Sequence, residues 1–234
     1  MSIIINITGL NIEIAGESAY IKEKCRDYIA KCAHPDITVS VTKQEIEKEK
    51  AGCPGFSDDY YEYVCVYRQI CLKLPLYGRM LVHSAVIDVN GRGYAFTAKS
   101  GVGKTTHIRM WKQAFGDEVS IINGDKPIYR FENGKVYACG TPWCGKEGYN
   151  VNRETELKAI CFVNRGIENK IERIEPKIAA DLFFGQILMP NDADAAIKTL
   201  ELCSELLESI PLYNLWCNIS EDAAIVARKS LDLA

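Results

Sequence analysis

Residues 98–105 read AKSGVGKT, a spacing of glycine, lysine and threonine that suits the binding of phosphate groups. The pattern GxxxxGK[ST] needs glycines where backbone amides curl around phosphate oxygens and a side chain would collide with them. Its lysine would reach the β- and γ-phosphates, and its threonine hydroxyl would join the ligands of a Mg²⁺ ion. We therefore predict a site for ATP and Mg²⁺. The residues expected to contact the nucleotide are Ser100, Gly101, Val102, Gly103, Lys104, Thr105 and Thr106, with Thr105 also a metal ligand.

The sequence on either side supplies the strand and the helix that a phosphate-binding loop requires. GYAFT at 93–97 precedes the loop, and a helical pattern, TTHIRMWKQAF at 105–115, follows it. The start of a helix adds unpaired N–H groups and the positive end of the helix dipole. Ala98 replaces the first glycine of the pattern, which matters only if that position needs a positive φ. His107 and Trp111 share one face of the helix and are expected to pack in the core.

A β-hairpin is predicted to carry His83 to the mouth of this loop. An Asn-Gly pair at 90–91 separates two alternating apolar runs, and this dipeptide is the strongest short-range hairpin signal. A two-residue turn there pairs Val89 with Arg92 and, counting outward, places His83 opposite Ala98. We predict that His83 is a catalytic residue and a metal ligand. The alternative is a histidine at a strand end whose hydrogen bonds the fold satisfies.

A carboxylate, Asp125, is expected close to the same loop. It follows the apolar strand VSIIN at 119–123, where a carboxylate can hold Mg²⁺ directly or through water. A second Asn-Gly hairpin, at 133–134, brings Asp125 near the segment GTPWCGKEGYN at 140–150. We predict catalytic and metal-binding roles for Asp125, against the alternative of an ordinary turn aspartate.

The segment 140–150 is the best candidate for a loop that faces the acceptor substrate. Its glycines permit closure, and Trp143 can stack or exclude water. Lys146 can offset the negative charge of a phosphoryl group in transfer, so we include it among the predicted catalytic residues. The alternative is a structured surface turn with a half-buried tryptophan.

Strands interleaved with helices, several of the strands in hairpins, predict an α/β fold with a mixed sheet. We place this core, with its phosphate loop, at residues 56–234. Its C-terminal third is predicted to be largely helical, over roughly 176–188, 192–209 and 221–231.

Residues 1–55 are predicted to form a small N-terminal α/β extension. Its expected elements are a hairpin that turns at Thr8-Gly9, a helix over 17–33 and a strand at 36–41. The lysine- and glutamate-rich run 42–59 is predicted to be a solvated connector, and an aspartate is expected to cap the helix that follows.

The composition is that of a globular chain with ample material for a core: 234 residues, 47% apolar and 25% charged. A net charge of −3 argues against nucleic acid as a partner. The apolar runs are too short to cross a bilayer and no signal peptide is evident, so we expect no membrane partner and a cytoplasmic location. The ten cysteines include no CxxC pair, and reduced, buried thiols are expected.

The block LVHSAVIDVNGRGYAFTAKSGVGKTT, residues 81–106, resembles the catalytic core of HPr kinase/phosphorylase. There a histidine, a strand, a short turn, a second strand and a GxSGxGK[ST] loop follow in the same order. The block is also similar to ATP-dependent phosphoenolpyruvate carboxykinase, whose HxSA segment precedes its loop. The specific part of the likeness covers roughly residues 80–130, and residues 1–55 resemble no family that we can name.

The resemblance implies roles for individual residues. His83 matches the active-site histidine, which is a metal ligand in the carboxykinases, and Lys104 and Thr105 match the phosphate and Mg²⁺ groups. Asp125 matches the second, metal-binding aspartate of a pair whose first member is Gly124 here. In HPr kinase that first carboxylate is thought to accept the proton of the substrate hydroxyl. Its absence means that another group, or Asp125 itself, serves as base, or that transfer is slow or lost.

The function predicted from these observations is a Mg²⁺-dependent kinase that transfers a phosphoryl group from ATP to a hydroxyl acceptor: serine, a small metabolite or a small protein. The alternative is a nucleotide-binding regulatory module with weak or lost transferase activity. A carboxykinase is disfavoured by the short chain, and a GTPase by the lack of an NKxD motif after the loop. No sequence motif identifies the phosphoryl donor as ATP or another nucleotide. Because HPr kinase is hexameric, the resemblance also raises the expectation of a homo-oligomer.

Overall fold

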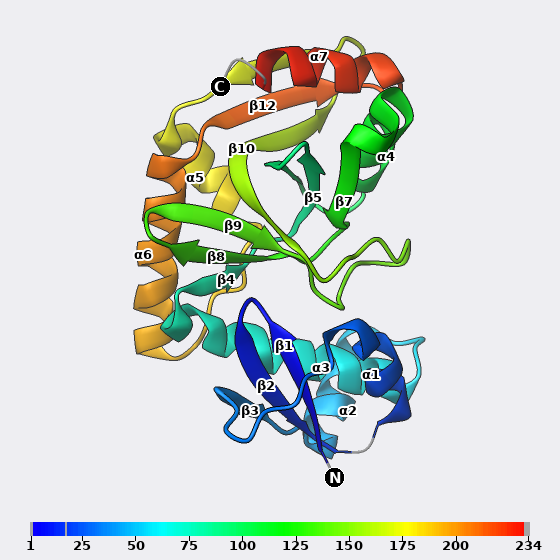
Figure 1. Ribbon diagram of the computed structural model, residues 1–234, viewed down its shortest axis with the longest axis vertical. Helices are drawn as coiled ribbons and strands as arrows, with labels where there is room; N and C mark the ends of the chain where they lie inside the picture. Colours follow the sequence, from blue (N-terminus) through cyan, green and yellow to red (C-terminus); the bar gives the residue numbers. More distant parts are fainter. Residues whose placement is uncertain (1, 17, 232–234) are drawn as a thin grey trace.

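The computed structural model describes residues 2–16 and 18–231, which form a small sheet near the N-terminus and a larger sheet in the rest of the chain (Figure 1). The small sheet has the order β1-β2-β3, with β1 and β2 antiparallel and β2 and β3 parallel. Its elements and the helices beside it are β1 (Ser2–Ile7), β2 (Leu10–Ala15), α1 (Ala19–Lys24), η1 (Arg26–Tyr28), β3 (Ile37–Val39), α2 (Lys43–Gly52), α3 (Asp58–Lys73) and η2 (Leu74–Tyr77).

The larger sheet is mixed, as predicted, and it has nine strands. Its main path is β4-β8-β9-β10-β6-β5-β7, and β12 joins β10 and carries β11 at its edge. The pair β6–β10 and the pair β10–β12 are parallel, while β5–β6 and β5–β7 are antiparallel. The strands are β4 (Arg79–Leu81), β5 (Ser84–Val89), β6 (Arg92–Thr97), β7 (Val119–Asn123), β8 (Ile128–Glu132), β9 (Lys135–Cys139), β10 (Glu154–Arg165), β11 (Lys170–Arg173) and β12 (Leu212–Cys217).

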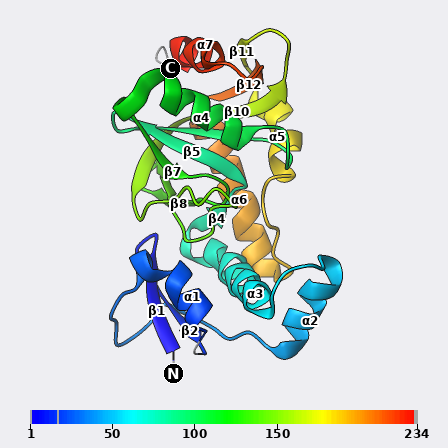
Figure 2. The same cartoon turned by 90° about the vertical axis from the view of Figure 1, so that its right-hand side faces the viewer.

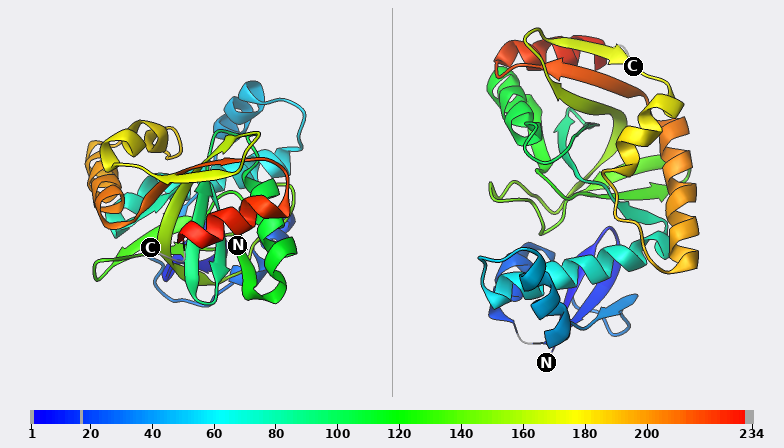
Figure 3. Two further views of the ribbon diagram at one scale, coloured as in Figure 1. Left: turned by 90° about the horizontal axis from the view of Figure 1, so that it is seen from above. Right: turned by 180° about the vertical axis from the view of Figure 1, so that it is seen from behind.

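Helices cover both faces of the larger sheet (Figure 3). One face packs on α4 and α7 through Ile87 and Phe96 from the strands and Trp111 from α4. The opposite face packs on α5 and α6, where Val86 and Phe162 lie in one cluster with helix residues. This alternation follows from the period of two along a strand. The helices are α4 (Lys104–Phe115), η3 (Gly116–Glu118), α5 (Pro176–Phe184), α6 (Ala193–Ser209) and α7 (Glu221–Leu231).

Both predicted hairpins of the core have the expected register. Val89 pairs with Arg92 and Ser84 with Thr97 across the first turn, and Ile128 pairs with Cys139 across the second. Asn90 and Asn133 have positive φ, followed by glycines with positive φ, as two-residue turns of this kind require. The predicted fold class, with its helical C-terminal third, is therefore confirmed.

The N-terminal segment differs from the prediction in three details. The helix predicted over 17–33 ends as α1 at Lys24, because the chain then extends to pair Ile29 with Ile5 of β1. The connector predicted at 42–59 contains a ten-residue helix, α2, that a capping box of Thr42 and Glu45 starts. The cap of α3 is the side chain of Ser57 rather than an aspartate. Figure 2 shows α2 set apart from the small sheet, beside α3.

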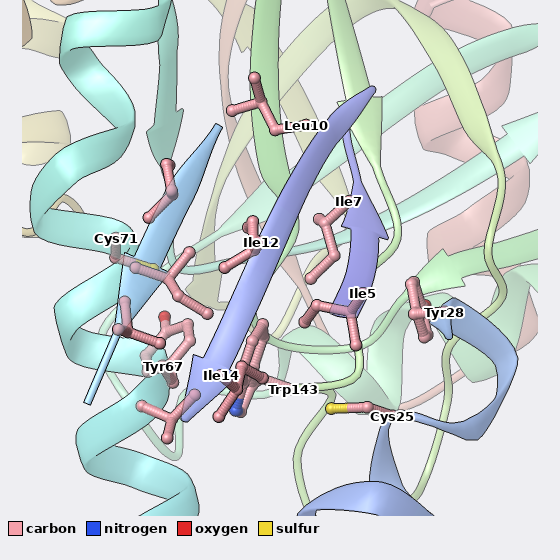
Figure 4. Close-up of a cluster of buried hydrophobic side chains, with 14 of the residues drawn as sticks. Ile5, Ile7, Leu10, Ile12, Ile14, Cys25, Tyr28, Tyr67, Cys71 and Trp143 are labelled. Atoms are coloured by element: carbon pink, nitrogen blue, oxygen red, sulfur yellow. The ribbon is translucent and has the colours of Figure 1, made fainter. Parts of the chain in front are cut away.

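One hydrophobic cluster joins the small sheet to α3 and to the loop that follows β9. Ile5, Ile7 and Ile12 of the small sheet, Tyr67 of α3 and Trp143 of that loop belong to it (Figure 4). The predicted boundary at residues 55–56 separates the small sheet from α3, yet the two share one hydrophobic cluster. The division into residues 1–55 and 56–234 therefore stays a prediction.

The ten cysteines are free, and six of them are buried. Burial raises the pKa of Cys25 to about 12 and that of Cys203 to about 12, which keeps these thiols protonated. Within residues 2–16 and 18–231, the helices are too short or too polar to cross a lipid bilayer.

Candidate functional site

The loop between β6 and α4 has the backbone that a phosphate-binding loop needs. Gly101 has a φ of 80° and Gly103 a φ of 131°, values that side chains rarely allow. Gly103 is the N-cap of α4, so the first amides of a twelve-residue helix lie at the end of the loop. Ala98, in place of the first glycine, is not among the described residues with positive φ, so the alanine costs nothing there.

Arg165, at the end of β10, holds the carbonyl side of this loop. Its guanidinium donates to the backbone oxygen of Gly101 at 2.7 Å and to that of Val102 at 3.3 Å. The same loop is closed by a second backbone contact, because the Val102 N–H donates to the Lys99 carbonyl at 3.3 Å. The sequence carries no local signal for the Arg165 contact, because Arg165 is more than sixty residues away.

The lysine of the loop is buried and points at the predicted histidine. Lys104 is 6% exposed, and its Nζ lies 2.9 Å from His83 Nε2 and 3.2 Å from the carbonyl oxygen of Ala98. Burial lowers the pKa of Lys104, while the charge of Asp125 partly opposes this change. The hairpin thus brings His83 to the loop, as its register predicted.

His83 is fixed by contacts on both sides of its backbone and at its ring. Its N–H donates to the carbonyl of Gln186 at 2.7 Å, and its carbonyl accepts from Thr97 Oγ1 at 2.9 Å. Its Nδ1 lies 3.1 Å from Gln186 Oε1. Because a carbonyl oxygen only accepts, Nδ1 is the donor to Gln186. Nε2 accepts from Lys104 when the ring is neutral, and it donates to Asp125 when the ring carries both protons.

Asp125 contacts the same imidazole nitrogen as Lys104. Its Oδ1 is 3.1 Å from His83 Nε2, and its Oδ2 is 2.5 Å from Lys126 Nζ. The buried side chain of Asn123 sets this turn by accepting from the N–H groups of Asp125 and Lys126 at 2.9 and 2.7 Å. Burial raises the pKa of Asp125, but the hydrogen bonds and charges of His83 and Lys126 outweigh it and hold the pKa well below its usual range.

Gly124, where the resembled families carry an aspartate, is closely covered by the 140–150 loop. Its N–H donates to the carbonyl of Tyr149 at 2.8 Å. A Cβ added to Gly124 would lie 3.2 Å from the Cys144 carbonyl oxygen and 3.2 Å from Tyr149 Cβ. Glycine at 124 therefore permits this loop to approach β7, and a larger side chain would displace it.

The predicted acceptor loop, 140–150, is tied to the end of β7. Asn123 Nδ2 donates to the carbonyls of Thr141 and Trp143 at 3.1 and 3.3 Å. Trp143 is 4% exposed, so it is a core residue more than a mobile cover. Lys146 is exposed and lines the same cavity as His83, but it is Lys126 that contacts Asp125. Lys126 and Gln186 were not predicted as site residues.

His107 and Trp111 of α4 pack beneath the loop, as predicted. Trp111 Nε1 donates to His107 Nε2 at 2.9 Å, and both side chains are almost fully buried. Burial lowers the pKa of His107 to about 3, so this ring stays neutral and has a packing role.

The donor set fits Mg²⁺ in part. Mg²⁺ prefers oxygen ligands and usually combines one or two protein groups with phosphate oxygens and water. The carboxylate of Asp125 and the hydroxyl of Thr105 are such groups, whereas an imidazole suits softer metals better. In the described part of the chain, no three His, Cys, Asp or Glu side chains are grouped to hold a metal. A Mg²⁺ ion would therefore need phosphate oxygens, and a direct bond to His83 is the least favoured of the predicted contacts.

Comparison of the sequence with protein-family models and with curated proteins finds no match. Among solved structures, the fold is similar to that of the HPr(Ser) kinase/phosphatase from Coxiella burnetii. The two chains are 9% identical, the TM-score is 0.38, and the alignment covers 64% of this chain and 95% of the other. This is a distant similarity of fold alone, and the function is argued below from the residues of the site.

Proposed function

We propose that this chain is a kinase that transfers the terminal phosphoryl group of ATP, with Mg²⁺, to the hydroxyl of an acceptor. The observation that carries the proposal is a continuous line of contacts at the loop. Lys104 Nζ lies 2.9 Å from His83 Nε2, which lies 3.1 Å from Asp125 Oδ1. An ammonium, an imidazole and a carboxylate within reach of a phosphate-binding backbone are the groups that phosphoryl transfer uses.

The reaction needs positioning and compensating charge more than covalent chemistry. The acceptor oxygen forms a bond to the γ-phosphorus, and the bond from that phosphorus to the β–γ bridging oxygen breaks. ADP leaves with the electron pair, and the hydroxyl proton passes to a base. Lys104 and the loop amides would hold the β- and γ-phosphates, with Asp125 and Thr105 as the protein ligands of Mg²⁺. When bound, Mg²⁺ would neutralise charge on the phosphates.

His83 is the base that the geometry favours. Its Nδ1–H is held by Gln186, so a lone pair on Nε2 faces the site. Asp125 is a weak base because its pKa lies well below the usual range, and it suits the binding of a cation. A polyphosphate bound by Lys104 would draw the ammonium from the imidazole and leave Nε2 for the acceptor hydroxyl.

A regulatory nucleotide-binding module is the second candidate function, and the observation that favours it is Gly124. No carboxylate stands at 124, and the backbone of Cys144 and the side chain of Tyr149 fill the space that one would use. Because Gly124→Asp would displace the loop, restoring that carboxylate is not a clean test of lost activity.

The experiment is a phosphoryl-transfer screen with γ-labelled ATP and Mg²⁺. Hydroxylated metabolites, free serine and small carrier proteins are offered as acceptors, and binding of Mg-ATP is measured in parallel by calorimetry. The kinase predicts labelled acceptor and faster ADP release, both lost in His83→Ala while Mg-ATP still binds. Binding with no acceptor-dependent turnover in the whole screen would favour the regulatory module. Absence of Mg-ATP binding would contradict both candidates.

A further inference from the structure

A cavity of about 660 Å³ starts at His83 and Lys126 and extends to residues of the N-terminal segment. Its walls come from the α1 and α3 region, from the 140–150 loop and from residues 185–188. The volume is within the range of small-molecule sites. Because Asp125 contacts both His83 and Lys126, a molecule in this cavity would reach the groups to which we assign the chemistry.

Six aromatic side chains line the cavity. Tyr63 and Trp143 stack with their ring centroids 5.6 Å apart. The Trp143 indole donates to the Tyr63 carbonyl at 3.3 Å, and the Tyr63 hydroxyl donates to the Pro142 carbonyl at 2.9 Å. This wall is held in place from two elements, so it offers a preformed surface to an apolar or aromatic body. The aromatic lining residues are Tyr20, Phe56, Tyr60, Tyr63, Tyr67 and Trp143.

The charged side chains that line the cavity are basic. They are Lys24, Arg68, Lys126 and Lys146, and among the described lining residues there is no Asp or Glu. Two of the four are neutralised, since Arg68 pairs with Glu49 at 2.7 Å and Lys126 pairs with Asp125 at 2.5 Å.

The other two lysines lie at the solvent side of the cavity with their charge uncompensated. Lys24 and Lys146 are exposed, and within the described chain neither has an ion-pair partner. The Lys24 ammonium lies 5.3 Å from the centroid of the Tyr20 ring, so the positive charge borders the aromatic wall. An anionic group at this rim would meet two ammonium groups without a competing carboxylate from the lining.

We propose, on the basis of the kinase function above, that the acceptor is a small organic acid with an apolar or aromatic body and a hydroxyl at its far end. The acid group lies at Lys24 and Lys146, the body lies along the Tyr63–Trp143 wall, and the hydroxyl reaches His83. The hydroxyl oxygen bonds to the γ-phosphorus, ADP leaves with the electron pair of the broken bond, and His83 takes the proton. The product is the phosphate monoester of the hydroxy acid. Helices α1 and α3, together with the loop after β9, thus select the acceptor.

The test uses para-(hydroxymethyl)benzoate, in which an aromatic ring separates a carboxylate from a primary hydroxyl, and its neutral counterpart para-benzenedimethanol. Calorimetry on the full chain compares the two probes in wild type, Lys24→Met and Lys146→Met. The control is Lys22→Met, a change on the same helix α1 outside the cavity lining. We expect the acid to bind at least tenfold more tightly than the diol. Each cavity-lysine variant should weaken the acid by roughly fivefold and leave the diol unchanged.

Each outcome decides one of the two proposals. Equal affinity for the acid and the diol would overturn the anionic acceptor. Binding of neither probe, with binding of a serine-containing peptide instead, would overturn the small-molecule acceptor. If the acid binds selectively but receives no label from ATP, the kinase function fails and the cavity assignment holds. If another acceptor is phosphorylated at a rate that Lys24→Met and Lys146→Met leave unchanged, the cavity assignment fails and the kinase function holds.

Discussion

The phosphate loop and the aromatic cavity meet at His83, but the chain builds them in opposite ways. The loop is one short segment between β6 and α4, with two glycines at positive φ and a helix start at its end. The cavity collects its walls from α1, α3, the loop after β9 and the turn after α5. One end of the site is therefore encoded in a few consecutive residues, and the other depends on the packing of distant segments.

The forces that hold the two ends also differ. Hydrogen bonds to the backbone fix the loop and its neighbours: Arg165 donates to the Gly101 carbonyl, and the His83 N–H donates to the Gln186 carbonyl. Ring packing fixes the cavity, where Tyr63 and Trp143 belong to the cluster that joins the small sheet to α3. Polar substitutions at the loop end should therefore change chemistry and binding more than stability. Truncating a ring of the cavity wall should unfold the protein more readily.

The sharpest test of this contrast is His83→Ala, which we expect to have the largest effect. Loss of a positioned proton acceptor should lower kcat by about 10³-fold, or about 4 kcal/mol in the transition state. His83 is at a strand end and partly exposed, so the melting temperature should fall little. Steady-state kinetics and thermal unfolding are measured on the same preparation, with His34→Ala, an exposed histidine remote in sequence, as the control. A lower melting temperature with kcat intact would make His83 a structural residue.

Lys104→Ala tests the loop itself. Its expected effect on nucleotide binding is about tenfold smaller than the expected effect of His83→Ala on kcat. Removing the ammonium deletes charge-assisted bonds to two phosphates, so the Kd for Mg-ATP should rise by about 100-fold, or about 2.7 kcal/mol. The comparison variant is Lys112→Ala on the same helix, which should leave the Kd unchanged. Binding of para-(hydroxymethyl)benzoate should survive in Lys104→Ala, because Lys104 does not line the cavity. Unchanged nucleotide affinity would contradict the assignment of the loop.

The same contrast explains what could be predicted from the sequence. Asn-Gly turns and glycines at positive φ act within a few residues, so both hairpins, their register and the strand–loop–helix order at 93–115 were predicted correctly. The polar run 42–59 was wrongly predicted to be a connector because the helix α2 has no buried residue, although Thr42 and Glu45 give a capping-box signal. Local signals therefore suffice where an element is defined by its own turn or cap.

Local sequence patterns could not identify the residues whose roles depend on tertiary contacts. Lys126 pairs with Asp125 in the turn between β7 and β8, whose shape depends on the Asn123 side chain and, through it, on the loop after β9. Gln186 lies 103 positions from the histidine that it orients. The cavity likewise depends on Trp143 meeting Tyr63 of α3 across 80 positions, and no spacing rule links them. Contacts between residues far apart in the sequence, rather than any motif, define the aromatic cavity.

Asp125→Asn tests the predicted metal role separately from the other contacts to the phosphates. Its expected effect is smaller than that of Lys104→Ala. The amide is a weaker oxygen ligand without charge, so we expect Mg-ATP to bind about 30-fold more weakly, or about 2 kcal/mol. ATP without Mg²⁺ should bind the variant as it binds the wild type. Calorimetry with and without Mg²⁺ is the measurement, and Asp117→Asn, an exposed residue paired with Lys112, is the control. Equal losses under both conditions would remove the metal role and leave Asp125 as the partner of His83 and Lys126.

The smallest expected effect concerns stability at the loop end, where α4 carries the buried, neutral His107. The described lining of the cavity contains no buried histidine of this kind. The folded-state pKa of His107 is about 3, against a value of 6.5 for the free side chain. Below pH 6.5, His107 is protonated in the unfolded chain but stays neutral in the folded chain. His107 therefore lowers the free energy of unfolding as the pH falls from about 6.5 toward 3. The contribution approaches about 1.4 kcal/mol per pH unit. In His107→Gln, which keeps an acceptor for the Trp111 indole, that part of the slope should vanish. Urea unfolding of both proteins from pH 7 to pH 5 measures the difference, and parallel slopes would mean that His107 becomes protonated inside the fold.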